Sequence, residues 1–112
     1  MEMSGLRRGN MSLRLPFDIP SQCKVMGLPV PVREFKFHPS RRWRVDYFFK
    51  DFGLAIEIEG GVWTKGRHIR GSGFLKDAEK YNNLTLLGYR LLRFTPQQER
   101  NGEAIEVIRQ LI

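Results

Sequence analysis

The sequence predicts an α/β fold, with a small mixed β-sheet flanked by helices in the order β-β-β-α-β-α. Two observations lead to this prediction. In the middle of the chain, two short segments alternate between apolar and polar residues and a third is rich in aromatic and β-branched residues, as strands are. Farther along, two segments with apolar residues at helical spacing enclose a fourth short apolar segment. The length of 112 residues fits one domain, which we place at residues 16–112.

The first half of the chain supplies three expected strands. Residues 16–27 can form one or two helical turns before a proline-rich stretch. The segments 34–38 and 43–49 have the alternation, or the aromatic and β-branched content, that is typical of strands. Residues 50–53 have the composition of a hairpin loop, and 54–59 again alternates. We therefore expect the second and third strands to form a hairpin.

The second half predicts two helices around a fourth strand. A basic loop with several glycines comes first. A helix is expected at 72–87, because a serine can cap its start and a glycine follows its end. Residues 89–94 form the fourth strand. Thr95, followed by Pro96 at the first helical position, then predicts the start of a terminal helix.

The chain is strongly basic. It contains 19 lysines and arginines against 12 acidic residues, which gives a formal net charge of +7. Such an excess in a small chain points to a polyanionic partner, most often nucleic acid. Residues 1–15 carry arginines without periodicity, and we expect them to form a flexible basic arm.

Other features of the composition indicate a compartment. The single cysteine, Cys23, cannot form an internal disulfide, which favours a reducing environment. No apolar run approaches the ~18 residues needed to span a bilayer. The N-terminal arginines are not followed by the apolar stretch of a signal peptide. We therefore expect a soluble, cytoplasmic protein with no membrane partner.

Three carboxylates on adjacent predicted strands are the most informative feature. A hairpin loop at 50–53 puts Asp46 opposite Glu57, about 5 Å away across the ladder. Glu59 lies two residues farther, on the same face. Like charges in this arrangement repel one another, and a divalent cation with oxygen ligands would compensate the repulsion. The alternative is an exposed sheet face whose acids are balanced by neighbouring arginines.

Several motifs in order resemble the PD-(D/E)XK nuclease superfamily, and more narrowly its very-short-patch-repair endonuclease-like small phage enzymes. The motifs are RRWRVD at 41–46, LAIEIEGG at 54–61, His68, DAEK at 77–80 and GYRLLRF at 88–94. The resemblance covers roughly residues 28–112. It implies a restriction-endonuclease-like core and an Mg²⁺- or Mn²⁺-dependent endonuclease that hydrolyses DNA.

The resemblance also implies residue roles. Asp46 and Glu57 would ligate the metal, together with the backbone carbonyl of Ile58. Glu59 stands where the superfamily has lysine, and it would act as an outer-shell ligand or as a base for the attacking water. We expect Lys80 or His68 to supply the missing cation.

Other residues leave alternatives open. Glu34 is either an additional active-site acid or an ordinary charge at a strand edge, and His68 is either catalytic or an exposed loop residue. One chain has one active site, so a double-strand cut needs a homodimer or two successive nicks. A basic module that binds DNA without cutting it is the alternative to an enzyme. The residues expected to hold DNA phosphates are Arg41, Arg42, Arg44, Lys65, Arg67 and Arg70.

Overall fold

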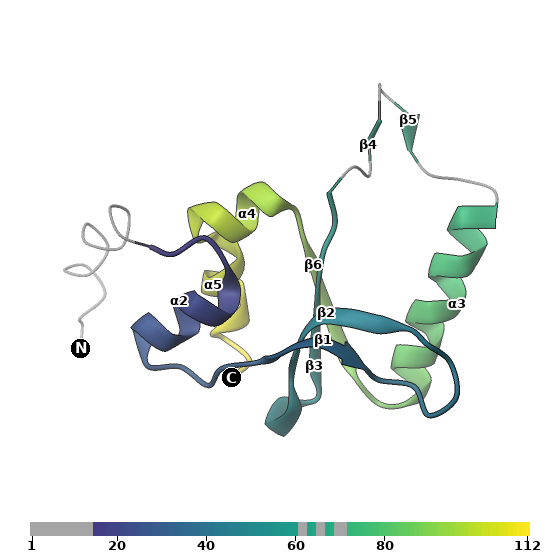
Figure 1. The fold of residues 1–112 in the computed structure, drawn as a ribbon, viewed down its shortest axis with the longest axis horizontal. Coiled ribbons are helices and arrows are strands. Elements are labelled where there is room, and N and C mark those ends of the chain that lie inside the picture. Colours follow the sequence, from purple (N-terminus) through teal and green to yellow (C-terminus); the bar gives the residue numbers. More distant parts are fainter. Residues whose placement is uncertain (1–14, 61–62, 65–66, 69–71) are drawn as a thin grey trace.

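The protein is built on a mixed β-sheet with helices on both of its faces (Figure 1). The computed structural model describes residues 15–60, 63–64, 67–68 and 72–112. The strands of the sheet lie in the order β1-β2-β3-β6. The strands β1 (Val32–Lys36), β2 (Arg44–Phe49) and β3 (Leu54–Ile58) are antiparallel in succession, and β6 (Arg90–Phe94) lies parallel to β3. The predicted α/β class and mixed sheet are confirmed.

The β2–β3 hairpin has the predicted register. Its loop is a short 3₁₀ helix, Lys50–Phe52, followed by Gly53 at φ 55°. A side chain would be strained in this left-handed region, so glycine suits the turn. The cross-strand pairs are Tyr47–Ile56, Phe48–Ala55 and Phe49–Leu54. Because side chains alternate along a strand, this register decides which residues share a face of the sheet.

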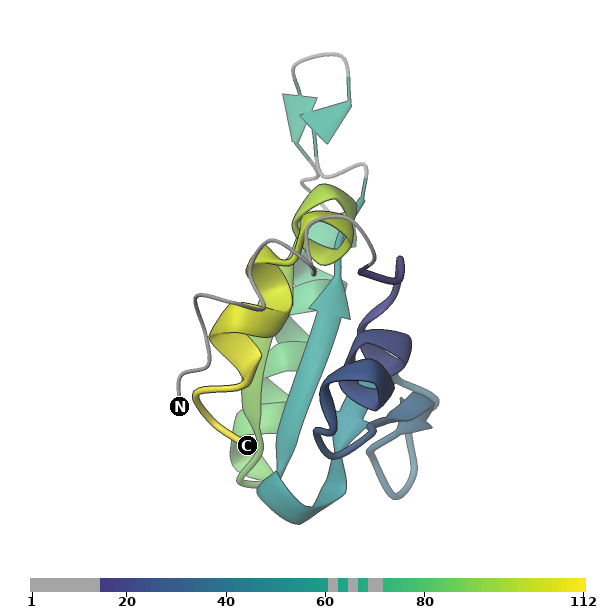
Figure 2. The same cartoon turned by 90° about the vertical axis from the view of Figure 1, so that its left-hand side faces the viewer.

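Three helices lie on one side of the sheet (Figure 2). They are α2 (Ile19–Met26), α4 (Pro96–Asn101) and α5 (Glu103–Ile108). The helices α2 and α5 bury apolar residues against alternate residues of β2, β3 and β6. The fully buried members of this cluster include Ile19, Leu54, Ile56, Ile105 and Ile108.

A single long helix, α3 (Ser72–Leu86), covers the opposite face. Its Leu84 is buried in a second cluster with Phe37, Val45, Phe48 and Ala55. The helix ends close to the predicted position, before Gly88 at φ 87°. It also connects β3 to its parallel neighbour β6, so side chains that point from these strands toward α3 meet one helix. The candidate site lies on this face.

The helical turns expected within residues 16–27 form one helix, α2. The structure differs from the prediction in three other places. The strand β1 begins two residues before the predicted segment 34–38. Two-residue strands, β4 (Trp63–Thr64) and β5 (Arg67–His68), pair where a loop was expected. Strands this short cannot show alternation in the sequence. The terminal helix is divided at Gly102, whose φ of 94° interrupts the right-handed helix.

Two further expectations concern the chain as a whole. Residues 1–14, which make up nearly all of the expected basic arm, lie outside the described residues. Among the helices that the structure describes, none has the length and apolar character to cross a membrane.

Candidate active site

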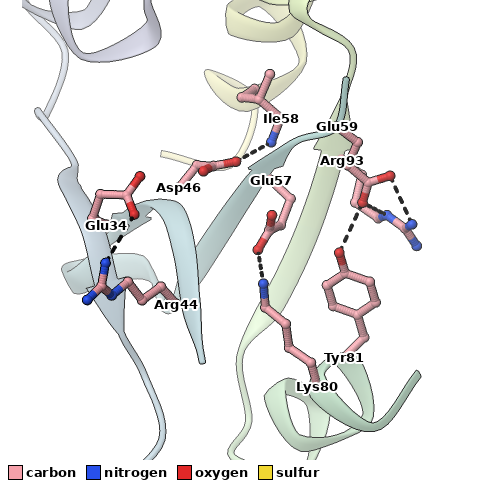
Figure 3. A network of polar contacts seen from close by, with 9 residues as sticks. All are labelled: Glu34, Arg44, Asp46, Glu57, Ile58, Glu59, Lys80, Tyr81 and Arg93. Carbon is pink, nitrogen blue, oxygen red and sulfur yellow. Dashed lines mark hydrogen bonds and ion pairs between the residues drawn. The ribbon is translucent and has the colours of Figure 1, made fainter. Parts of the chain in front are cut away.

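Four charged residues stand in one row across the sheet, one from each strand. Glu57 of β3 pairs directly with Arg93 of β6. The β2–β3 register, carried on by one residue, puts Asp46 opposite Glu57, as predicted. The β1–β2 register puts Glu34 opposite Asp46. Three carboxylates and one guanidinium therefore come from adjacent strands (Figure 3).

Asp46 is held by the backbone of the neighbouring strand. Its Oδ2 accepts a hydrogen bond from the Ile58 N–H at 2.7 Å. In an extended strand the N–H and C=O of one residue point to the same edge, so the Ile58 carbonyl also faces β2. The predicted ligand set of Asp46, Glu57 and the Ile58 carbonyl thus lies along the boundary between β2 and β3.

Glu57 is buried, with 8% of its surface exposed, and it contacts Lys80 of α3. The Lys80 Nζ lies 2.7 Å from the Glu57 Oε2, as in a charge-assisted hydrogen bond. Burial raises the pKa of Glu57, and the carboxylates of Asp46 and Glu59 raise it further, although Lys80 opposes them. The expected approach of Lys80 to Glu57 is confirmed.

Glu59 contacts Arg93 of β6 and Tyr81 of α3, neither of which is among the site residues predicted above. Its Oε2 accepts hydrogen bonds from the Arg93 Nε at 2.6 Å and from the Tyr81 hydroxyl at 3.1 Å. Its Oε1 accepts from the Arg93 Nη2 at 3.0 Å. Burial and the nearby carboxylates, Glu57 first, hold the pKa of Tyr81 well above its usual range, so this hydroxyl stays a donor. The sequence signal for Tyr81 is its helical spacing from Phe74 and Ala78, which favours a position facing the sheet.

Glu34 has an unusual backbone conformation. Its φ is 48°, in the left-handed region that non-glycine residues seldom adopt. Such a conformation costs on the order of 1–3 kcal/mol and is often found at functional sites. The carboxylate of Glu34 lies 3.8 Å from the Arg44 guanidinium, and both side chains are exposed. The structure therefore brings Glu34 into the row without joining it to Asp46 or Glu57 by a direct contact.

The arginines between β1 and β2 differ in their surroundings. The guanidinium of Arg41 stacks on the Trp43 ring at 3.9 Å and pairs with Glu79 of α3 at 2.9 Å. This arginine holds the pKa of Glu79 below its usual range. Arg42 is exposed and has no ion-pair partner in the described part of the chain. Of these two arginines, Arg42 is the more available to an external anion.

The other residues expected to bind DNA lie in the segment between β3 and α3. Lys65 and Arg70 fall outside the described residues. Arg67 and His68 make up β5, whose backbone pairs with β4. The position of the His68 side chain relative to Glu57 is therefore not part of the described geometry.

The oxygen atoms that a divalent cation could use at this site are few. Within the described ranges, no group of three or more His, Cys, Asp or Glu side chains is arranged to hold a metal ion. Asp46 and Glu57 nevertheless each keep one carboxylate oxygen that accepts no hydrogen bond from a described residue. Magnesium typically takes one or two protein carboxylates and completes its shell with water and phosphate oxygens. Two carboxylates and a nearby carbonyl are compatible with that requirement.

A scan of the chain against protein-family models finds no match, and neither a search of curated proteins nor a search of solved structures finds one.

Proposed function

We propose that this protein is a metal-dependent endodeoxyribonuclease of the PD-(D/E)XK type, which hydrolyses DNA phosphodiester bonds with Mg²⁺ or Mn²⁺. The sheet with helices on both faces would then be a restriction-endonuclease-like core. The proposal is carried by one observation: Asp46 and Glu57 stand side by side on adjacent strands, with Lys80 2.7 Å from Glu57, in a chain of net charge +7. Carboxylates beside an ammonium suit the binding of a metal and a phosphate together.

Asp46, Glu57 and the carbonyl of Ile58 would hold the metal. When bound, it would activate water at neutral pH and neutralise charge on the scissile phosphate. Lys80 would contribute the cation that lies beside these ligands. Its ammonium would stabilise the phosphate or align the attacking water. Positioning and electrostatics of this kind supply most of the catalysis in phosphoryl transfer.

DNA would be held through its phosphates, chiefly by the arginines between β1 and β2. Such contacts position the duplex without reading its sequence. The single site of one chain would nick one strand, or cut at a particular DNA structure. A double-strand cut would need a homodimer or two successive nicks. We place this activity in the cytoplasm.

A module that binds DNA without cutting it is the second candidate. It is favoured by the fact that Glu57 and Glu59 are each already paired with a cation of this chain. In that case the carboxylates would stabilise the fold, and the basic surface alone would have a function.

Incubation with supercoiled plasmid tests the proposal. The protein is supplied with Mg²⁺, Mn²⁺ or a chelator, and relaxed and linear products are measured. We expect cleavage with the metals and none with the chelator. Asp46→Asn should abolish cleavage. The fold should be kept, because the amide oxygen can still accept the Ile58 hydrogen bond. DNA binding should be intact or tighter, because a negative charge that faces the phosphate has been removed. Asp51→Asn is the matched control, since Asp51 is exposed in the hairpin loop. Absence of cleavage by the parent protein, or unchanged cleavage by Asp46→Asn, would overturn the proposal.

A further inference from the structure

Beside the Asp46–Glu57 pair lies a cluster that the proposed mechanism does not use. It consists of Glu59, Tyr81 and Arg93, which come from the end of β3, from α3 and from β6 (Figure 3). Three hydrogen bonds join its members, two from Arg93 and one from Tyr81, and all of them end on the Glu59 carboxylate.

The cluster holds one guanidinium in a defined orientation. The Nε and Nη2 of Arg93 grip both oxygens of Glu59, which is the two-point geometry available to arginine and not to lysine. The Arg93 Cζ also lies 4.6 Å from the centre of the Tyr81 ring, at cation–π distance. An exposed ion pair by itself contributes only about 0–1 kcal/mol. The contacts of Arg93 with Glu59 and with the Tyr81 ring therefore orient its side chain more than they stabilise the fold.

The guanidinium of Arg93 has further N–H groups with which it can bind an anion. Arginine has five N–H groups, and Glu59 takes two of them, so three have no partner among the described residues. Half of the Arg93 side chain surface is exposed, against a fifth of that of Glu59. The remaining donors are thus open to an anion from solvent, and a phosphate matches their planar arrangement.

The N–H groups of Arg93 that Glu59 does not occupy lie next to the proposed metal ligands. Arg93 pairs with Glu57 across adjacent parallel strands, which lie about 4.8 Å apart. Lys80 approaches the same Glu57 from α3. The Lys80 side chain is only 19% exposed and its ammonium is bound to Glu57, whereas half of the Arg93 side chain is exposed. Of the two cations beside Glu57, Arg93 is therefore the one more accessible to an anion from solvent.

We propose that Arg93 is a ligand for a DNA backbone phosphate and that Glu59 and Tyr81 are positioning residues that orient its guanidinium. This inference rests on the proposed nuclease function for its substrate. It assigns to Glu59 a role different from that of a metal ligand or base. A phosphate bound by Arg93 would lie beside the Asp46–Glu57 pair.

The first test measures binding of a labelled duplex by fluorescence anisotropy over a range of salt concentrations. Calcium replaces magnesium, so that binding is measured without turnover. Arg93→Gln should weaken binding about tenfold at low salt, as expected for one charge-assisted contact. It should also reduce the slope of log K against log salt by about one unit. Arg90→Gln is the control, because Arg90 lies at the other end of β6 and donates to the Phe52 carbonyl; its slope should equal that of the parent.

Two further variants separate orientation from charge. Arg93→Lys keeps the charge and loses the two-point grip, so the salt slope should persist while cleavage in Mn²⁺ slows about tenfold or more. Glu59→Gln removes a negative charge, which by simple electrostatics would tighten DNA binding. If Glu59 positions Arg93, Glu59→Gln should instead bind DNA more weakly and have a higher KM. Tyr81→Phe should also have a higher KM.

The outcomes distinguish this inference from the proposed function. If the parent cleaves DNA but Arg93→Gln binds with the parent's affinity and slope, the inference is wrong and the nuclease stands. If the parent binds DNA without cutting it and Arg93→Gln loses one unit of slope, the phosphate contact stands and the nuclease fails. Tighter binding by Glu59→Gln overturns the positioning role. If Arg93→Gln does not fold, Arg93→Lys decides, and parent-like affinity and cleavage by that variant overturn the proposal.

Discussion

The ammonium of Lys80 and the carboxylate of Glu57 form an ion pair between α3 and β3, with 2.7 Å between Nζ and Oε2. The two side chains are only 19% and 11% exposed, so salt screens their interaction less than that of a surface pair. The pair lies next to Asp46, which the β2–β3 register puts opposite Glu57. A lysine in this place can serve the proposed reaction, and it also competes with any cation that approaches Glu57.

Removal of Lys80 should slow cleavage. We expect Lys80→Ala to reduce the cleavage rate on the order of 10²-fold, comparable to the loss of one preorganised electrostatic donor. Its DNA affinity should change little, because the ammonium is paired with Glu57 and only 19% of the Lys80 side chain is exposed. Initial rates on plasmid, measured beside the affinity of the same variant, check this. His68→Ala is the comparison, and normal cleavage by Lys80→Ala together with none by His68→Ala would assign the role to the histidine.

The same ion pair predicts an effect on metal affinity in the absence of DNA. A divalent cation that binds Glu57 must compete with the Lys80 ammonium, so Lys80→Met should bind Mn²⁺ about tenfold more tightly, or about 1.4 kcal/mol. Calorimetric titration of the protein with Mn²⁺ at pH 8 measures it. Lys76→Met serves as the control, because Lys76 is an exposed residue of the same helix. Weaker binding by Lys80→Met would show that the lysine does not compete for this site.

The N-cap of α2 predicts a pH dependence of stability. The Asp18 carboxylate accepts hydrogen bonds from the Ser21 N–H and from Arg33, both at 3.0 Å. Partial burial raises the pKa of Asp18, but Ser21 and Arg33 together outweigh it and bring the pKa below its ordinary value of 3.8. The stabilisation is therefore present above the pKa of the unfolded chain and is lost as the pH falls through the folded pKa.

Asp18→Ala should consequently lower the free energy of unfolding by about 1 kcal/mol at pH 7. The difference from the parent should shrink below about pH 4, where the carboxyl of the unfolded chain becomes protonated. Urea unfolding at several pH values measures both quantities. Asp18→Asn keeps an acceptor without the charge, so its difference from the parent at pH 7 should be smaller. A pH-independent difference for Asp18→Ala would mean that the charge of the cap contributes nothing.

Binding of DNA should weaken steeply with salt. Engagement of about five phosphates implies a slope near −4 to −5 in log K against log salt for a duplex. Arg42→Gln should reduce the slope by about one unit, whereas Arg41→Gln should reduce it less, because Arg41 already pairs with Glu79. Anisotropy titrations at several salt concentrations give the three slopes. A flat dependence for the parent would leave the net charge of +7 as a contribution to solubility alone.

Local sequence rules specify several parts of this protein. The hairpin register followed from the alternation of β2 and β3 and from a loop that ends in Gly53, so Asp46 and Glu57 could be paired in advance. The end of α3 before Gly88 and the start of α4 at Thr95 depend on residues within one turn of the helix end. In each case the deciding interactions span only a few residues of chain.

Contacts between segments far apart in the chain are not encoded by any local pattern. The partners Glu59 and Arg93 are 34 residues apart, and no tight turn fixes the parallel register of β3 and β6 that joins them. Glu99 likewise accepts hydrogen bonds from the Ile19 N–H and the Tyr47 hydroxyl, at 2.9 and 2.6 Å, only because α2, α4 and β2 meet in one core. Contacts between distant segments depend on how the layers pack, and periodicity within each segment says nothing about that register.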